Sequence, residues 1–333
     1  MIVTIREVAA HAEVSVSTAS RALSGRRKVS PEIVARVVAA AEHLGYRPNA
    51  IAQALRDQTT RTVGMVVPSI TIPFFPEIVQ AVEFELQRSG RELILCDSQY
   101  DPDIEARRLR VLIERKVDGL IISPCHLERS RTAVAEAARA VPLVQLDRYV
   151  EGGVTDWVGV DDETGITLVV NHVIAGGARD LVFVGSELDN SSARLRLAAF
   201  ERSARAGGAR IADVLLGEFS VAWGQQAAER LHSDGRLPDA VICGNDEIAL
   251  SLLRGLRSHG VRVPDDVAIT GFDDIGYAQL SHPALTTVRQ PREQLAHEAL
   301  RVLTEARSGH SSRRIAIAPQ LVVRETTRPE GPS

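Results

Sequence analysis

The chain has 333 residues, of which 44% are hydrophobic and 25% charged, and its formal net charge is −4. This composition is typical of soluble globular proteins, and the length allows two or three domains. No stretch of 18 apolar residues occurs and no apolar run precedes the first predicted helix, so we expect a cytoplasmic protein that is neither secreted nor membrane-spanning.

Charge is distributed unevenly along the chain. Residues 1–60 hold eight Lys and Arg against five Asp and Glu, a net charge of +3, which leaves −7 for the remaining residues. A basic N-terminal segment on an acidic remainder favours a segment that binds phosphate. The three cysteines, Cys96, Cys125 and Cys243, end strand-like runs far apart, which predicts small buried thiols and neither a disulfide nor a metal site.

Residues 4–24 predict two short helices joined by a tight turn. Their apolar residues recur at helical spacing on one face: Ile5, Val8, Ala9 and Ala12, then Ala19, Ala22 and Leu23. Ser15 is expected to cap the second helix by accepting a hydrogen bond from the backbone N–H of Ser17 or Thr18. Val16, Ser17, Ser20 and Arg21 then face outward, on the end of the helix that a helix-turn-helix protein inserts into the major groove.

A third helix is expected from Pro31, with Ser30 before it as cap and Gly45 at its end. Its predicted buried side contains Ile33, Val34, Val37, Val38, Ala41 and Leu44. The alternative interpretation of this domain of about 45 residues is a three-helix module that binds protein instead of DNA.

A short segment, Tyr46 to Arg56, separates the third helix from the first strand-like run. Pro48 would begin a short helix there, filled by Ala50, Ile51, Ala52, Ala54 and Leu55. Such a short helix is marginal alone in water, so we expect it to form only when other contacts hold it.

Together these segments resemble a known family. Thr4-x-x-x-Val8-Ala9, Val14-Ser15-x-x-Thr18-x-Ser20-Arg21-x-Leu23 and Gly45-Tyr46-x-Pro48-Asn49-x-x-Ala52-x-x-Leu55 are similar to the head and hinge of the lactose-repressor (LacI) family of bacterial transcription regulators. The resemblance implies a dimer whose paired hinge helices enter the minor groove, with Leu55 wedging a base step and Asn49, Ala52 and Gln53 beside it. The alternative for Leu55 is packing of an ordinary linker helix on the body.

The resemblance also implies roles in the head. Val16, Ser17 and Arg21 would read base edges, and Thr4, Ser15, Ser20 and Ser30 would contact phosphates. Val16 is limited to apolar contact, for example with a thymine methyl group, whereas Arg21 is able to donate two hydrogen bonds to guanine. Arg21 is therefore the principal candidate for sequence readout.

From Thr62 onward, apolar strand-like runs alternate with amphipathic helices. Strands are predicted at 62–67, 92–96, 118–123, 142–146, 181–184, 211–216, 240–243 and 267–270, and helices at 75–89, 103–116, 130–140, 163–175, 193–206, 222–233 and 246–258. Continuous apolar strands separated by helices indicate parallel sheets covered on both faces. The predicted fold class is an all-α helix-turn-helix head with a hinge helix, followed by a two-lobed α/β body of two doubly wound parallel sheets.

By resemblance, the body shares the fold of periplasmic sugar-binding proteins, and the chain crosses between lobes near residues 159–162, 287–291 and 318–322. The expected domains are a head at 1–46, a hinge at 47–60, one lobe at 61–160 and 289–320, and the other at 161–288 and 321–333.

Ligand sites in open parallel sheets lie at the carboxyl ends of the strands. Polar and aromatic side chains that suit a sugar follow the predicted strands, and the candidates are Ser69, Phe74, Phe75, Asp147, Arg148, Arg194, Arg196, Phe219, Asn245, Asp273 and Gln290. Arg196, Asn245, Asp273 and Asp147 match the family's hydroxyl-binding positions, and Phe219 matches a stacking aromatic in some relatives. Many relatives have Asn before Pro-Phe-Phe, where this chain has Ile72, so a polar contact is expected to be missing there.

Several of these residues have other interpretations. Asp246 is either a ligand contact or the N-cap of the following helix, and Asp274 caps or turns the chain. Arg194 is alternatively a surface charge or a lobe-closing charge.

Catalysis is not indicated. The phosphate-binding loops Gly-x-x-x-x-Gly-Lys-Ser/Thr and Gly-x-Gly-x-x-Gly and the nucleophile motif Gly-x-Ser-x-Gly do not occur. The acid pairs Asp161-Asp162 and Asp273-Asp274 have no His or Cys cluster beside them, so no catalytic residue, metal site or cofactor is predicted.

The predicted function is therefore a homodimeric repressor of a carbohydrate-utilisation operon, released from a palindromic operator by a monosaccharide or sugar-derivative effector. Alternatives are the same DNA role with a purine corepressor or a protein partner, and a sugar receptor that does not bind DNA. The C-terminal residues lack leucine heptads, so a coiled-coil tetramer is not expected.

Overall fold

The computed structural model describes residues 3–24, 29–46, 59–152, 155–305 and 312–328. The chain divides into two compact units, Met1–Thr60 and Arg61–Ser333, which we call the head and the body.

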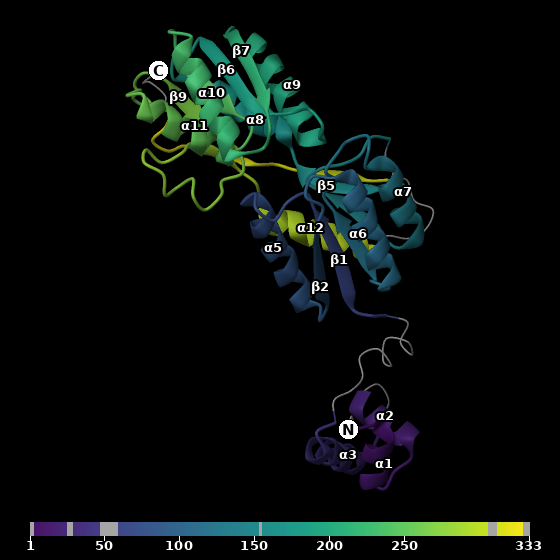
Figure 1. The fold of residues 1–333 in the computed structure, drawn as a ribbon. Coiled ribbons are helices and arrows are strands. Elements are labelled where there is room, and N and C mark those ends of the chain that lie inside the picture. The colour runs from purple at the N-terminus through teal and green to yellow at the C-terminus, as the bar shows by residue number, and fades with distance from the viewer. Residues whose placement is uncertain (1–2, 25–28, 47–58, 153–154, 306–311, 329–333) are drawn as a thin grey trace. The chain divides into compact units, whose positions relative to one another are not determined.

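The described residues of the head form three helices (Figure 1), and these pack around a small apolar core. They are α1 (Ile5–His11), α2 (Val16–Ser24) and α3 (Pro31–Leu44). The buried core consists of Val8, Ala9, Ala12, Ala19, Ala22, Val37, Ala40 and Ala41. The predicted helix-turn-helix is confirmed, and Gly45 ends α3 in the left-handed conformation at φ 65°. Val38 was predicted to lie on the buried side of α3, but this prediction is wrong because the residue is 37% exposed. Ala40 is buried in the core of the head.

The first lobe of the body contains a six-stranded parallel sheet in the order β11-β5-β4-β3-β1-β2. Its strands are β1 (Thr62–Val67), β2 (Glu92–Asp97), β3 (Gly119–Ile122), β4 (Leu143–Leu146), β5 (Asp156–Val160) and β11 (Arg314–Ile317). Its helices are α5 (Phe74–Arg88), α6 (Pro102–Glu114), α7 (Arg131–Ala140) and α12 (Arg292–Glu305).

Side chains alternate between the two faces of this sheet, as the period of a strand requires. Met65 and Val67 share a core with α5 and α12, whereas Val66, between them, shares another with α6 and α7. Burial on both faces explains why β1 is apolar along its length.

The second lobe repeats this plan with a four-stranded parallel sheet in the order β7-β6-β8-β9 (Figure 1). Its strands are β6 (Asp180–Ser186), β7 (Arg210–Gly217), β8 (Ala240–Cys243) and β9 (Ala268–Thr270). Its helices are α8 (Asp162–Ala175), α9 (Ser191–Ala206), α10 (Val221–Ser233) and α11 (Asp246–Ser258). The predicted fold class is confirmed for the helix-turn-helix head and the two parallel α/β sheets, whereas the hinge helix lies outside the described residues.

A two-stranded antiparallel ribbon completes the body. It pairs β10 (Thr287–Arg289) with β12 (Gln320–Val322). The chain enters the second lobe after β5, reaches α12 on the first sheet through β10, and leaves β11 of the first sheet through β12. β5, β10, β11 and β12 were not predicted as strands. β10 and β12 have three residues each and lie within the expected crossings, and β5 runs into the crossing expected at 159–162.

Candidate functional site

The solvent-facing side of α2 carries the side chains predicted to read DNA bases. Val16 is 43% exposed, and Ser17 and Arg21 are also exposed, whereas Ala19 and Ala22 are buried. A helix packed on one side and open on the other is suited to insert its N-terminal part into the major groove. Direct base contact by these three residues stays a prediction.

The predicted phosphate contacts lie mainly at helix N-termini, where backbone N–H groups attract anions. Ser15 caps α2 as predicted, its Oγ accepting from the Thr18 backbone N–H at 3.1 Å. Thr4 precedes α1 and donates from its backbone N–H and hydroxyl to Glu7 at 2.6 and 2.9 Å. Ser30 stands at the N-cap of α3, but its hydroxyl makes no capping hydrogen bond. Ser20 lies within α2 and is half-buried.

The predicted hinge residues Asn49, Ala52, Gln53 and Leu55 lie outside the described residues. Their insertion into the minor groove stays a prediction.

The two lobes contribute to one group of buried polar side chains, the interlobe cluster. Its members are Asp147, Arg148, Asp162, Arg196, Asp273 and Gln290. Asp147 and Arg148 follow β4 of the first lobe, and Asp273 follows β9 of the second. The carboxyl ends of the parallel strands therefore place these residues together, as expected of an open α/β sheet.

Arg196 is the centre of the cluster. Its Nε donates to Asp162 Oδ1 at 2.7 Å and its Nη1 to the Gly244 carbonyl at 2.8 Å. Asp273 Oδ1 is 3.7 Å from the same Nη1, and the guanidinium lies over the Phe272 ring at 3.7 Å from its centroid. Gln290 Nε2 donates to Asp273 Oδ1 at 2.7 Å, which fixes the carboxylate from the other side.

Burial shifts the acids of the cluster toward their protonated forms. Desolvation raises the pKa of Asp162 to about 6 and that of Asp273 to about 7, although Arg196 opposes both shifts. The pKa of Asp147 is raised for the same reason. Asp162 and Asp273 therefore titrate close to neutral pH, where their carboxyl groups are able to donate as well as accept hydrogen bonds.

Aromatic rings border the cluster at Arg148. The Arg148 guanidinium lies 5.5, 5.4 and 5.2 Å from the ring centroids of Phe75, Tyr100 and Phe219. Tyr100 and Phe219 are nearly parallel, with centroids 6.3 Å apart. Because Tyr100 follows β2 and Phe219 follows β7, these rings join the two lobes.

Other predicted effector residues lie around this group. Ser69 is buried and its hydroxyl pairs with that of Thr71 at 2.8 Å, and Phe74 packs edge-on against Phe75 in the apolar core. Arg194 is bound to Glu128 and Glu151 of the first lobe at 3.2 and 3.4 Å. This geometry fits the lobe-closing interpretation of Arg194.

The N-cap of α11 is Asn245, whose Oδ1 accepts from the Ile248 backbone N–H at 3.0 Å. The interpretation of Asp246 as that cap is wrong. Asp246 is fully buried and accepts instead from the Ile275 backbone N–H at 2.9 Å.

Asp162 and Tyr100 are members of this region that the sequence did not single out as ligand contacts. Asp162 follows β5, a strand that was not predicted. Tyr100 follows β2, so the end of that predicted strand was the signal that would have found it.

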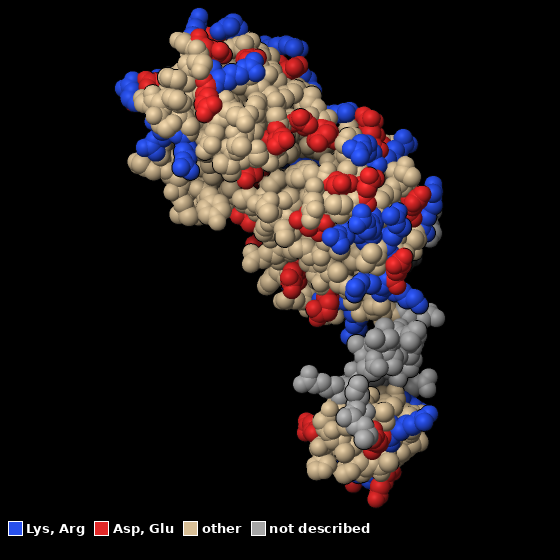
Figure 2. Space-filling model, viewed as in Figure 1, with Lys and Arg blue, Asp and Glu red and all other residues tan. Residues whose placement is uncertain are grey.

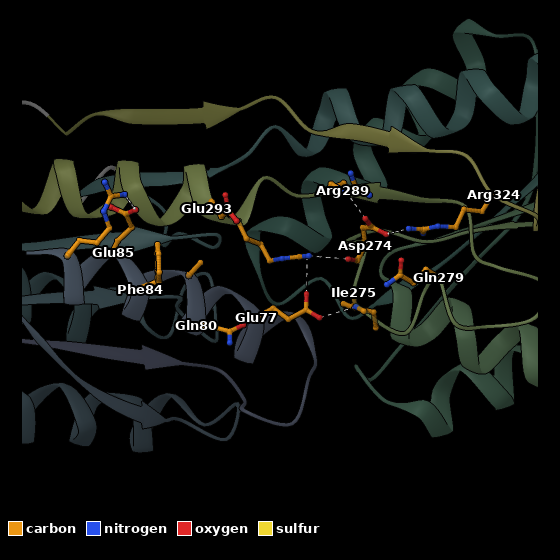
Figure 3. Close-up of a pocket in the computed structure, with 14 residues that line it drawn as sticks. Glu77, Gln80, Phe84, Glu85, Asp274, Ile275, Gln279, Arg289, Glu293 and Arg324 are labelled. Atoms are coloured by element: carbon orange, nitrogen blue, oxygen red, sulfur yellow. Dashed lines mark hydrogen bonds and ion pairs between the residues drawn. The ribbon is translucent and has the colours of Figure 1, made fainter.

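A separate cavity of about 830 Å³ lies between α5 and the loops after β9 and β10. Figure 3 shows Glu77 and Asp274 among its lining side chains. Glu77 accepts from the Gly276 backbone N–H at 3.0 Å and pairs with Arg292 at 3.1 Å, so it links the two lobes. Asp274, expected to cap or turn the chain, is ion-paired with Arg289 and Arg324 at 2.6 Å each.

Within the described ranges, no cluster of three or more His, Cys, Asp or Glu is arranged to hold a metal ion. None of the helices described has the length and apolar character needed to span a bilayer. Acidic and basic side chains are interspersed over the visible face of the body (Figure 2).

Comparison with known proteins agrees with this architecture. Residues 4–49 match the family model "Bacterial regulatory proteins, lacI family", and residues 170–327 match "Periplasmic binding protein-like domain". The HTH-type transcriptional repressor PurR of Haemophilus influenzae (strain PittEE) is 32% identical over 98% of both chains. The PurR repressor of Photobacterium profundum is 31% identical over the same share.

Solved structures extend the likeness to the whole described fold. The lac repressor dimer bound to operator and the anti-inducer ONPF is 27% identical, with a TM-score of 0.91 over 98% of this chain and 99% of that one. The regulator CelR in complex with cellobiose is 29% identical, with a TM-score of 0.73 over 97% of this chain and 99% of that one. The chain therefore belongs to the lacI family of bacterial regulatory proteins and is a DNA-binding transcription regulator, not an enzyme.

Proposed function

We propose that this regulator is a homodimeric repressor of a carbohydrate-utilisation operon, released from a palindromic operator by a monosaccharide or sugar derivative. The interlobe cluster is the observation that carries the effector part. Sugars are bound by charged and amide side chains that grip adjacent hydroxyl groups, with an aromatic ring against the C–H face. Asp147, Arg196, Asp273 and Gln290 offer the polar groups, and Phe219 offers the ring.

The proposal keeps the full predicted set of effector contacts and the predicted domains. The contacts are Ser69, Phe74, Phe75, Asp147, Arg148, Arg194, Arg196, Phe219, Asn245, Asp273 and Gln290. The CelR complex with cellobiose supports a sugar, because CelR is similar in structure over 97% of this chain and was solved with a carbohydrate. Since the target is bacterial DNA, we place the protein in the cytoplasm.

Exposed apolar side chains on the body support the dimer. Phe84 of α5 is 63% exposed, and Tyr277 and Leu280 are 64% and 75% exposed. Large apolar side chains that gather on a surface mark an interaction site. The lac repressor relative was solved as a dimer, and a two-fold dimer requires a two-fold operator.

The mechanism couples the effector to the hinge. A ligand between the lobes changes their relative angle, separates the two hinge segments, melts their marginal helices and lowers operator affinity. This coupling requires the ligand to prefer one lobe arrangement over the other.

A purine corepressor is the second candidate effector. The nearly parallel rings of Tyr100 and Phe219 favour it, since they offer stacking surfaces to a planar base. In this case the ligand would strengthen operator binding instead of weakening it.

The test begins with selection of operator DNA from a random duplex library by the full chain. The selected operator is then titrated with pentoses, hexoses and hypoxanthine while binding is followed by fluorescence anisotropy. We expect a palindrome and its release by a sugar. Strengthened binding with hypoxanthine, and no effect of any sugar, would reject the sugar effector and leave the DNA role intact.

Arg21 provides the sharpest prediction for the head. Arg21→Ala should lower operator affinity by roughly 10- to 100-fold, since one bidentate base contact contributes about 1–3 kcal/mol of discrimination. Preference at one base pair of each half-site should also relax. Arg36→Ala, which removes an exposed charge from α3, is the control and should leave the base preference unchanged. An unchanged base preference in Arg21→Ala would contradict the assignment.

A further inference from the structure

Arg148 is a buried cation with few polar contacts. Only 4% of the residue is exposed. Nη2 donates to the Tyr100 hydroxyl at 3.4 Å, and Nε is 3.7 Å from Asp147 Oδ2. Among the described residues, neither Nε nor Nη1 has a hydrogen-bond partner. Buried donors without acceptors are costly, so a ligand that offers oxygen atoms to them gains binding energy.

The three rings around Arg148 limit what is able to reach those donors. Phe75, Tyr100 and Phe219 lie at similar distances from the guanidinium of Arg148 and surround it with apolar surface. The polar groups beside these rings are therefore the N–H donors at the edge of the guanidinium. A ring with C–H faces and oxygen atoms on its edge suits both surfaces, because the faces meet the aromatic rings and the oxygens meet Nε and Nη1.

The charge balance of the site opposes an anionic ligand. The two guanidinium groups of the interlobe cluster, Arg148 and Arg196, face three carboxyl groups, Asp147, Asp162 and Asp273. Arg196 is already bound to Asp162 and to a backbone carbonyl. A phosphate or carboxylate would bring a further negative charge beside these acids, so it would bind only if they held additional protons, a cost that a neutral ligand avoids.

Arg292 does not change this balance. Its positive charge also lowers the pKa of Asp273. Its guanidinium is nevertheless already occupied, because it pairs with Glu77 and donates to the backbone carbonyls of Asp273 and Asp274.

Two of the other buried groups without a hydrogen-bond partner in the described part of the chain belong to Gln290 of the interlobe cluster and to α9, the helix that carries Arg196. They are the Gln290 Oε1 atom and the Ser192 hydroxyl, each on a residue at most 5% exposed. Gln290 Oε1 is only able to accept hydrogen bonds, so a ligand group that binds to it has to be a hydrogen-bond donor. Hydroxyl groups serve both needs, since they donate to Gln290 and accept from Arg148.

We propose that Arg148 is a specificity-determining residue of the effector site and that it selects an uncharged polyol. Sugar phosphates and sugar acids are then weaker ligands than their neutral parents. This inference rests on the proposed sugar effector and narrows it to uncharged sugars. The Nε and Nη1 donors of Arg148 are assigned the role of distinguishing neutral sugars from charged ones.

The test compares matched ligands by isothermal titration calorimetry on the full chain. The pairs are glucose with glucose 6-phosphate, galactose with galacturonate, and ribose with ribose 5-phosphate. We expect the neutral member of the pair that binds to be at least tenfold tighter than the charged member. Tighter binding of a charged member would overturn the inference while leaving the sugar-responsive repressor in place.

Variants at Arg148 test the residue itself. Arg148→Met should weaken the neutral sugar at least tenfold, and Arg148→Lys should restore part of the loss by returning a donor. Arg210→Met, at the start of β7 and away from the carboxyl ends of the strands, is the control and should bind as the unmodified protein does. Operator binding without ligand and circular dichroism establish that each variant is folded. Undiminished sugar binding by Arg148→Met would overturn the inference.

Binding of hypoxanthine alone, with neither member of any sugar pair, would reject the proposed sugar effector and this inference with it. Loss of the sugar effector is thus distinguishable from loss of the Arg148 assignment, which fails when a sugar binds but Arg148 has no effect.

Discussion

At the scale of single residues, burial of charged side chains determines the hydrogen bonds and the pKa values of the interlobe cluster. Asp273 is only 5% exposed and its backbone has φ 115°, a conformation that side-chain-bearing residues rarely adopt. It is retained there by the Gln290 hydrogen bond and by Arg196 at 3.7 Å. Strain and burial at one residue are typical of a site built for binding instead of stability.

The raised pKa of Asp273 gives a prediction about stability and pH. Its pKa is about 7 in the folded protein and 3.8 by reference, so between these values the folded state holds the extra proton. The contribution of Asp273 to the free energy of unfolding is therefore largest at low pH and falls as the pH rises toward 7. Each unit of pKa difference corresponds to about 1.4 kcal/mol.

Asp273→Asn should therefore lose less free energy of unfolding between pH 5 and 8 than the unmodified protein. Asn removes the ionisation, retains an oxygen for Gln290, and tolerates positive φ better than most residues. Urea unfolding followed by circular dichroism at pH 5, 6, 7 and 8 measures this. The exposed Asp213→Asn serves as control and should follow the unmodified protein. Equal pH slopes for Asp273→Asn and the unmodified protein would show that Asp273 titrates normally.

At the scale of elements, local sequence rules account for most helix ends. The N-caps of α2 and α3 show where these rules succeed and where they fail. Ser15 and Ser30 both precede a helix of the head, and both residue types suit an N-cap. Only Ser15 makes the side-chain bond, to the Thr18 backbone N–H. α3 has Pro31 at its first turn, which already lacks one of the N–H groups that a cap would satisfy.

Ser15→Ala should therefore destabilise α2 by about 1 kcal/mol, whereas Ser30→Ala should have a smaller effect on α3. Hydrogen–deuterium exchange of the full chain measures local opening, and the α2 amides should exchange about fivefold faster in Ser15→Ala, as 1 kcal/mol implies. Equal effects of the two substitutions on their helices would contradict the role of the Ser15 hydroxyl.

Strands were predicted unevenly for a similar physical reason. The runs at Thr62–Val67 and Ala240–Cys243 were identified because they are central and apolar on both faces. Arg314–Ile317 lies at the sheet edge and alternates exposed with half-buried residues, and β10 and β12 have three residues each. Short edge strands have little apolar signal of their own, because pairing with a neighbour decides them.

At the scale of the whole molecule, exposed apolar side chains on the body form the surface that we propose for the dimer. Tyr277 and Leu280 border a hollow of about 410 Å³ together with Leu250 and Leu253. Residues this apolar and exposed contribute strongly to an interface when a partner covers them.

Leu280→Asp should convert the dimer toward monomer, with a loss of roughly 2 kcal/mol, or about 30-fold, in self-association. Operator affinity should fall in parallel, because two linked heads bind a palindrome more tightly than separate ones. Sedimentation equilibrium and operator titration measure both. Leu168→Asp, on the exposed side of α8, provides the matched control and should remain dimeric. A dimer of unchanged strength in Leu280→Asp would remove this surface from the proposed interface.

The sequence by itself determined the class of protein and most of its elements. Helical periodicity at Ile5, Val8 and Ala12, caps such as Ser15, and the alternation of apolar strands with helices are local patterns, so they are readable without coordinates. The candidate residues Asp147, Arg196 and Asp273 were also accessible, since each follows a strand or a motif that the family shares.

Only the tertiary structure decided how those residues meet. Asp162 approaches Arg196 across 34 positions of sequence, and Tyr100 approaches Phe219 from the other lobe. Burial of Arg148 among three rings, and the pairing of Arg194 with Glu128 and Glu151, depend on strands that converge from both lobes. Desolvation and long-range pairing are properties of the assembled body, and for this reason no local pattern in the chain predicts them.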